Sequence, residues 1–343
     1  DTYTKMVDSE LSFLKYGAFA QFSKVFLQNK LVASLGVRAD NNTFTTGKTA
    51  PNFSPRLSLA YNLSPKSSFN ANVGRFYQLP SYTILGFKID DKFVNKDSEY
   101  IQCDHAVFGY EFNPTNYSKI TIEGFYKQYS NYPFSLRDSV SLANLGGDFG
   151  VIGNEDVTSE SKGKSYGLEL LAQQKLSSSL YGILAVTYYR SLFEDKNQEL
   201  VSSSWDNKFI VNFTAGKKFK RNIEAGLKFR YSGGAPYSPY DYDATLQDWS
   251  SNQQGVVDFN RLNSERFENY HSMDIRIDKK WYYKKWSLNA YIDLQNVYAF
   301  EVIGRSNIST DPDVGDKIDG YDLYEIPNIS GNSLPSIGLL IDF

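Results

Sequence analysis

Apolar and polar residues alternate along much of the chain. In the segments 223–230, 273–278 and 286–294, one set of alternate positions is apolar throughout. The other set is polar, apart from Gly226 and Tyr291. Successive side chains of a β-strand point to opposite faces of its sheet, so a period of two indicates strands with one apolar and one polar face.

The same pattern predicts about thirteen strands in an all-β, antiparallel fold. Most of them are longer than the usual soluble strand and reach the ~9–11 residues that cross a bilayer at a tilt. The predicted strands are 11–27, 31–43, 54–63, 68–78, 98–112, 118–129, 163–175, 179–191, 205–218, 221–231, 270–280, 286–297 and 334–343.

Short and long connections alternate between these strands. The short ones lie at 29–30, 64–67, 113–116, 176–178, 220 and 282–285. The long ones lie near 44–53, 79–97, 130–162, 192–204, 232–269 and 298–333. Tight turns at one end and long loops at the other are typical of an outer-membrane β-barrel, whereas a soluble sandwich has no reason to sort its loops in this way.

The composition agrees with a strand protein. Aromatic residues make up 16% of the 343 residues, with 26 Tyr and 24 Phe, and many of them stand at predicted strand ends, where a ring suits the lipid headgroup level. A mean hydropathy of −0.43 does not contradict a membrane barrel, because transmembrane strands expose only alternate residues to lipid.

Little in the sequence points to catalysis, a cofactor or nucleic acid. One Cys and two His leave no cysteine-rich metal module or His-based site, and a net charge of −3 without a basic block disfavours nucleic acid as a partner. The stretch 163–167 matches G-x-S-x-G, but Ser165 lies within an alternating strand and not at a strand-to-helix turn. We therefore expect no enzyme activity and no cofactor.

One stretch carries a family resemblance. Residues 53–87 read FSPRLSLAYNLSPKSSFNANVGRFYQLPSYTILGF, which resembles the barrel of Bacteroidetes-type TonB-dependent receptors. Further matches to the same pattern follow in order at 106–111, 163–171, 230–241 and 273–298. The resemblance implies an outer-membrane transporter for nutrient uptake, located in the bacterial outer membrane, with the TonB complex as a partner.

Family members also carry a plug domain and a TonB box, and their barrels close with about 22 strands. The thirteen predicted strands end at the C-terminus, so we expect residues 1–343 to be the C-terminal segment of such a barrel, without plug or TonB box. Two alternatives remain open: a passive porin or channel built from these strands, and a soluble β-rich surface binding protein.

The candidate site residues lie outside the strands or at the last one. Tyr237, Tyr240, Tyr242 and Trp249 follow a Gly-Gly-Ala-Pro turn in a long loop, where exposed aromatic rings could stack on sugars, aromatic chelators or peptides, or instead fold onto the barrel rim or contact a surface lipoprotein. The family resemblance implies a siderophore, cobalamin, glycan or peptide as the substrate.

Two further features complete the candidates. The acidic loop residues Asp311, Asp313, Asp316 and Asp319 could supply oxygens to Ca²⁺, although the spacing departs from an EF-hand loop and favours a solvated loop. Leu339, Ile341 and Phe343 alternate up to a C-terminal Phe. This resembles the signal read by the barrel insertion machinery, which together with outer-membrane lipid is an expected partner.

Overall fold

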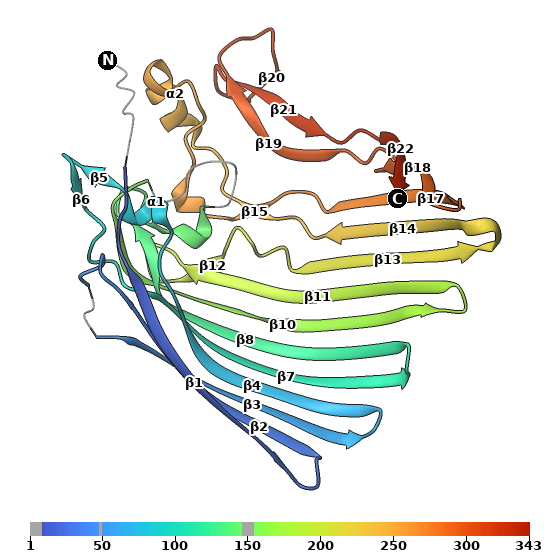
Figure 1. Cartoon of the computed structure of the whole chain (residues 1–343). Coiled ribbons are helices and arrows are strands. Elements are labelled where there is room, and N and C mark those ends of the chain that lie inside the picture. The colour runs from blue at the N-terminus through green and yellow to red at the C-terminus, as the bar shows by residue number, and fades with distance from the viewer. Residues whose placement is uncertain (1–8, 48–49, 146–153) are drawn as a thin grey trace.

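The computed structural model describes residues 9–47, 50–145 and 154–343 and contains one large antiparallel sheet. In these ranges thirteen strands follow one another in chain order across the sheet (Figure 1). They are β1 (Lys15–Phe26), β2 (Leu31–Asn42), β3 (Asn52–Ser64), β4 (Ser67–Gln78), β7 (Ile101–Thr115), β8 (Ser118–Ser135), β10 (Val157–Ser177), β11 (Leu180–Glu194), β13 (Phe209–Phe219), β14 (Ile223–Ser232), β17 (Tyr270–Tyr282), β18 (Ser287–Gln295) and β22 (Leu334–Asp342).

Each strand pairs with its sequence neighbours, so the topology is an up-and-down meander. Two short strands extend the sheet at its margin: β9 (Val140–Ser141) pairs with β8, and β12 (Leu200–Ser202) pairs with β11. In the described part of the chain, β1 and β22 form the two edges and do not pair with each other. The predicted all-β antiparallel fold is therefore confirmed as a partial, open barrel.

The pairing register places apolar residues next to apolar residues on one face. Leu57 of β3 pairs with Leu35 and Val73, and Ile292 of β18 pairs with Ile277 and Ile337. We call this row of outward positions the apolar stripe. The opposite face carries charged residues such as the ion pairs Arg230–Asp274 (3.1 Å) and Arg276–Asp278 (2.8 Å).

No second layer of the described chain covers the apolar stripe, and many of its side chains are exposed. Ile337 is 80% exposed, Phe22 67% and Leu168 60%. Burying a side chain of this size stabilises a protein by about 1.5–3 kcal/mol, so a sheet that leaves a whole face open needs another apolar medium against it. Within the described residues, the apolar stripe does not pack against a second sheet as it would in a two-layer sandwich.

The connections differ at the two ends of the sheet. Tight turns join alternate strands, and in one of them Ser178 and Ser179 both have a positive φ, as a two-residue turn matching the twist of a hairpin requires. Long connections occupy the other end, as Figure 1 shows. The alternation predicted from the sequence is confirmed.

The long connections contain short elements that the alternation pattern does not predict. They are α1 (Tyr82–Leu85), β5 (Lys88–Ile89), β6 (Lys92–Phe93), η1 (Leu142–Asn144), β15 (Pro236–Tyr237), α2 (Tyr242–Asn252), η3 (Phe259–Arg261), β16 (Glu265–Arg266), β19 (Val302–Ser309), β20 (Asp316–Lys317) and β21 (Tyr324–Ser330), while η2 (Lys220–Asn222) forms a turn. Within the described residues, none of the helices has the length and apolar character required to cross a membrane.

Most fully buried side chains lie in the connections and not on the sheet. Leu85 and Leu323 are 0% exposed, and so are the polar residues Asn95, Asp206 and Thr245. Asn95 donates from its amide nitrogen to the carbonyl oxygens of Ile84 and Glu155, both at 2.8 Å. The core of the described chain is therefore a layer of interlocked loops at one end of the sheet.

Candidate ligand site in the long connections

One cavity of the loop layer lies where the connection 233–269 meets the connection 296–333, and its volume is about 320 Å³. Its lining comes from both connections: Tyr237, Pro239, Tyr240, Tyr242, Arg261, Glu265, Arg266, Phe267, Glu268, Ile303, Gly304, Arg305, Ser306 and Glu325. Three of the four predicted aromatic residues are therefore brought together.

Tyr237 forms the aromatic wall of this cavity. Its ring stacks on Phe267 with a centroid distance of 4.3 Å and an interplanar angle of 20°. Its hydroxyl donates to Glu265 Oε2 at 2.8 Å. Burial, followed by this carboxylate, raises the pKa of the Tyr237 phenol. The stacking and the hydroxyl hydrogen bond together hold the Tyr237 ring in one orientation.

Tyr242 is held in a similar way at the beginning of α2. Its hydroxyl donates to Glu325 Oε1 at 3.2 Å, and its ring lies 5.3 Å from the ring of Tyr321. Burial, followed by the charge of Glu325, raises the pKa of Tyr242 to about 12. Asp241 caps α2 by accepting from the Ala244 amide at 2.9 Å, which fixes where the helix begins.

Arg305 is one of three arginines that line the cavity, with Arg261 and Arg266. Its Cζ lies 5.0 Å from the ring centroid of Tyr240 and 5.6 Å from that of Tyr237, and Nη2 donates to the carbonyl oxygen of Ser238 at 2.5 Å. No carboxylate of the described residues lies within ion-pair distance of Arg305. A guanidinium between two rings, without an acidic partner, is suited to an anionic or aromatic ligand group.

A second cavity, of about 380 Å³, adjoins the first and shares Tyr237, Phe267 and Arg305 with it. Trp249, the fourth predicted residue, lies on α2 and lines neither cavity. The four aromatic residues are half-buried and not fully exposed as the loop position suggested, because the two connections pack against each other.

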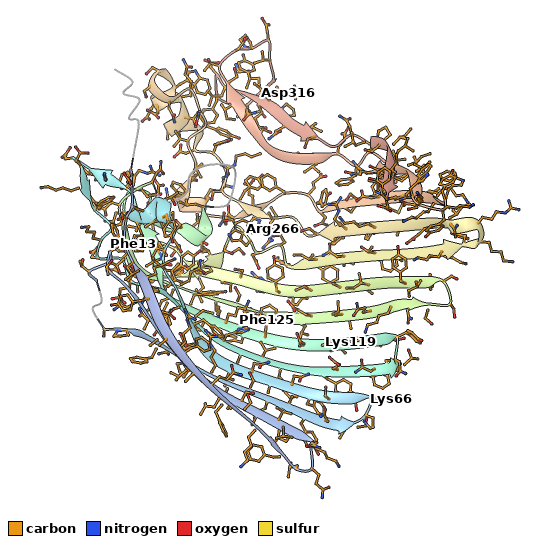
Figure 2. All side chains as sticks on the ribbon, viewed as in Figure 1. Phe13, Lys66, Lys119, Phe125, Arg266 and Asp316 are labelled. Atoms are coloured by element: carbon orange, nitrogen blue, oxygen red, sulfur yellow. The ribbon has the colours of Figure 1, made fainter. Side chains whose placement is uncertain are left out.

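A buried charge cluster adjoins the site through Arg266, which lines the cavity. Asp206 is 0% exposed and accepts from Arg266 Nη2 at 2.7 Å and from Arg190 Nε at 3.1 Å. Arg266 also donates to the carbonyl oxygen of Gly234 at 2.9 Å. Figure 2 shows Arg266 between the sheet and the elements above it. The cluster ties the connections 195–208 and 233–269 to the rim of β11.

The acidic candidates lie elsewhere. Asp311 and Asp313 form a turn in which the Asp313 amide donates to Asp311 Oδ1 at 3.0 Å, and Asp316 begins β20 (Figure 2). Within the described ranges, no three His, Cys, Asp or Glu side chains are grouped so that they could hold a metal ion. Asp319 lies in the same region, between β20 and β21.

The C-terminal candidates occupy β22 and the residue after it. Leu339 is 68% exposed, Ile341 53% and Phe343 101%. Leu339 pairs with Ala290 and Ile341 with Leu288, so both continue the apolar stripe to the edge of the sheet.

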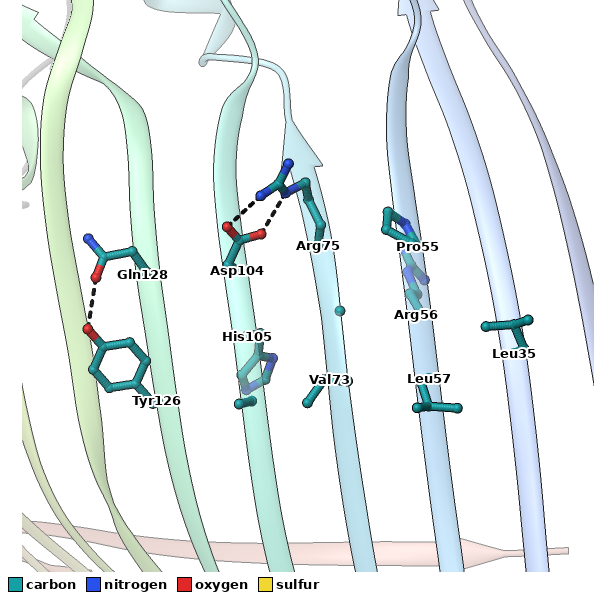
Figure 3. A pocket seen from close by; sticks show the side chains of 12 residues that line it. Leu35, Pro55, Arg56, Leu57, Val73, Arg75, Asp104, His105, Tyr126 and Gln128 are labelled. Atoms are coloured by element: carbon teal, nitrogen blue, oxygen red, sulfur yellow. Dashed lines mark hydrogen bonds and ion pairs between the residues drawn. The ribbon is translucent and has the colours of Figure 1, made fainter.

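A shallow hollow of about 610 Å³ lies on the sheet itself. Leu35, Leu57, Val73 and Ala106 of the apolar stripe line it, and the bidentate ion pair of Arg75 with Asp104 borders it (Figure 3). These positions belong to the uncovered apolar face of the sheet, so this hollow is separate from the cavities of the loop layer.

Sequence reasoning missed Arg305, Glu325 and Phe267. The tyrosines form a cluster that is visible in one loop of the sequence, whereas Arg305 and Glu325 lie in another connection about sixty to ninety residues away. No local pattern marks them, and only the packing of the two connections brings them to the site.

Comparison with known proteins agrees with this architecture. A family model described as "TonB dependent receptor-like, beta-barrel" matches residues 6–297. None of the curated proteins matches the chain.

Several solved structures share the fold. The ferripyoverdine receptor of the Pseudomonas aeruginosa outer membrane superposes with a TM-score of 0.62 at 15% identity, covering 96% of this chain and 38% of that one. The ferric-catecholate import receptor Fiu of E. coli K12 gives 0.61 at 11%, covering 96% and 45%. The ferric yersiniabactin receptor FyuA of Yersinia pestis gives 0.60 at 12%, covering 96% and 46%. The chain spans less than half the length of these proteins, and the match over 6–297 shows that it belongs to the family of TonB-dependent receptor-like β-barrels.

Proposed function

We propose that this chain is the C-terminal barrel segment of a Bacteroidetes-type TonB-dependent transporter that takes up a nutrient across the bacterial outer membrane. The observation that carries the proposal is the uncovered apolar stripe of a single-layer sheet whose turns and loops are sorted to opposite ends. Lipid on the stripe and water on the charged face would satisfy both surfaces. The plug domain, the TonB box and about nine further strands would be supplied by the part of the protein that precedes this chain.

The substrate would be captured at the loop end. The stacked Tyr237, the neighbouring Tyr240 and the unpaired Arg305 support a ligand with a planar or sugar ring and a negative group, a description that some siderophores, cobalamin, glycans and peptides meet. The similar receptors are named for ferripyoverdine, ferric catecholates and ferric yersiniabactin, and another, OprC, for copper. TonB would pull on the plug, while a surface lipoprotein is an alternative partner of the loops.

Uptake by the whole protein that carries this chain tests the proposal. Growth on limiting candidate nutrients should require both the gene and TonB, and Arg305→Gln should lower uptake while the surface level of the protein stays constant. Lys96→Gln, a change in another long connection, is the matched control and should leave uptake unchanged.

Two outcomes would contradict the proposal. Uptake without TonB, together with ion conductance of the purified protein in planar bilayers, would identify a passive channel. Quantitative recovery as a soluble monomer without detergent would identify a soluble binding protein.

A further inference from the structure

We propose that the neighbouring turns β13–β14 and β17–β18 form a binding site for the phosphate headgroup of an anionic phospholipid in the leaflet at the turn end of the sheet. The inference rests on the proposed function, since it requires the sheet to span a membrane. These turns and the adjoining strand ends carry eight basic residues: Lys217, Lys218, Lys220, Arg221, Lys279, Lys280, Lys284 and Lys285.

Few carboxylates balance this charge. Glu224 and Asp342 engage Lys218 at 3.9 Å and Lys280 at 3.0 Å, and Asp278 is bound by Arg276 at 2.8 Å. In the described part of the chain, the other six basic side chains have no carboxylate within 4.0 Å. A phosphate group is the counter-charge that such a cluster lacks.

The two turns act as one surface because β14 and β17 are paired. Ile223 lies opposite Lys279 in the register, directly beside the β13–β14 turn. The Lys279 ammonium group donates to the carbonyl oxygen of Arg221, which joins the end of β17 to that turn. Headgroup contacts from both hairpins therefore converge on one place.

Aromatic rings stand among the lysines. The Lys217 ammonium lies 5.4 Å from the ring centroid of Phe219, and the Lys279 ammonium 5.6 Å from that of Trp281. Tyr283 stacks on Trp286 at 4.2 Å across the β17–β18 turn. All four rings are exposed. Exposed rings next to lysines are typical of a membrane–water boundary, where the ring contacts the acyl region and the ammonium reaches phosphate.

The position of the lysines decides between a lipid and another anion. Lys217 follows Ala215 and Lys279 follows Ile277 on the apolar stripe, so each ammonium stands at the border of the apolar face. A free phosphate or an acidic protein would not need this junction of apolar, aromatic and basic positions. A phospholipid would occupy it with its acyl chains and its headgroup together.

The turn ends of the hairpins β3–β4 and β7–β8 carry fewer basic residues. Lys66 and Lys119 mark the turn end of β4 and β8 in Figure 2, but Lys66 donates to the Pro114 carbonyl oxygen at 3.1 Å and Lys119 pairs with Glu111 at 2.5 Å. At those hairpins the basic residue already has a hydrogen-bond or ion-pair partner. Among the residues that the structure describes, the side chains of Lys217, Lys220, Arg221, Lys284 and Lys285 have none, whereas Lys218, Lys279 and Lys280 each have one.

Native mass spectrometry of the whole protein tests the proposal, after exchange into micelles with equal amounts of phosphatidylglycerol and phosphatidylcholine. We expect preferential retention of phosphatidylglycerol. A variant with Lys217→Gln, Lys279→Gln, Lys284→Gln and Lys285→Gln should lower this preference at least about tenfold, because each basic residue near an anionic surface contributes about a fivefold factor. The corresponding Lys→Arg variant should retain it.

The matched control removes four lysines from the long connections and their rim: Lys88→Gln, Lys92→Gln, Lys96→Gln and Lys162→Gln. It should leave the preference unchanged while lowering the net charge equally. A membrane-inserted protein without lipid preference, or an equal loss in both variants, would overturn the headgroup site and leave the transporter proposal intact. A protein that does not insert into lipid would overturn the transporter proposal itself.

Discussion

Ile292 in the middle of β18 offers a direct test of which medium covers the apolar stripe. It is 59% exposed and lies between Ile277 and Ile337 in the register. It stands five residues after Ser287, which at ~3.3 Å per residue and a tilt of ~40° places it about 13 Å above the turn end, near the middle of an apolar band ~25 Å tall.

Ile292→Arg should therefore lower the free energy of unfolding by about 2–4 kcal/mol in lipid, the cost of an arginine near the bilayer midplane. If water covered this face, the same substitution at an already exposed position would change stability by no more than about 0.5 kcal/mol. The difference is at least about 1.5 kcal/mol and corresponds to a factor of roughly 10 or more in the folding equilibrium, well outside the error of a titration.

Ser336→Arg is the matched control. Ser336 of the neighbouring strand β22 pairs with Asp293 of β18 on the charged face, so the new guanidinium would stand opposite a carboxylate and should cost little. Urea titration of the protein in lipid vesicles, followed by tryptophan fluorescence and by the heat-dependent shift in gel mobility, measures both variants. Equal effects of the two substitutions would refute the assignment of the apolar stripe to lipid.

Further predictions concern the loop layer and the last residue. Asp206→Ala should lower the free energy of local unfolding of the loop layer by about 3–5 kcal/mol, because it leaves two arginines without their buried partner. Limited proteolysis within 195–208 should therefore increase while the sheet stays intact. Since the pKa of Tyr242 is raised to about 12, its neutral phenol stabilises the site fully below pH ~10 and this contribution is lost as the pH rises through 12. Absorbance titrations of the protein and of Tyr242→Phe should differ by one late-titrating phenol, and Glu325→Gln should lower the pKa of that phenol. Deleting Phe343 should reduce assembly in the outer membrane, measured as heat-modifiable protein, without preventing refolding into vesicles in vitro.

The sheet was predictable because an uncovered apolar face leaves a period of two in the sequence. The prediction was least accurate at the loop end, where β8 continues to Ser135 instead of 129 and β10 begins at Val157 instead of 163. There the strands leave the apolar stripe and the register shifts near Ser161, so the alternation disappears although the pairing continues. The strand predicted at 205–218 begins at Phe209, because Asp206 is held by arginines in a turn.

The ligand site was only partly predictable. An aromatic cluster in one loop identified Tyr237, Tyr240 and Tyr242, but Arg305 and Glu325, two of the charged residues of the site, lie in another connection. The loop layer is assembled by contacts that are distant in sequence, such as the bond from the Asn263 amide to the Asn144 carbonyl oxygen at 3.1 Å across 119 positions. Hydrophobic periodicity cannot predict such contacts, because it indicates only which face of a local element is apolar.

The division of the molecule into an open sheet and a buried loop layer has a consequence for how its parts unfold. The sheet has backbone hydrogen bonds but almost no protein-buried apolar core, so its stability depends on the medium against the apolar stripe. The loop layer has its own buried polar network around Asn95 and Asp206, and therefore does not depend on lipid for its packing. Removing lipid should consequently weaken the turn end of the sheet before the loop cluster. Hydrogen exchange should show this as earlier loss of protection in β17 and β18 than in the strand β12 beside Asp206.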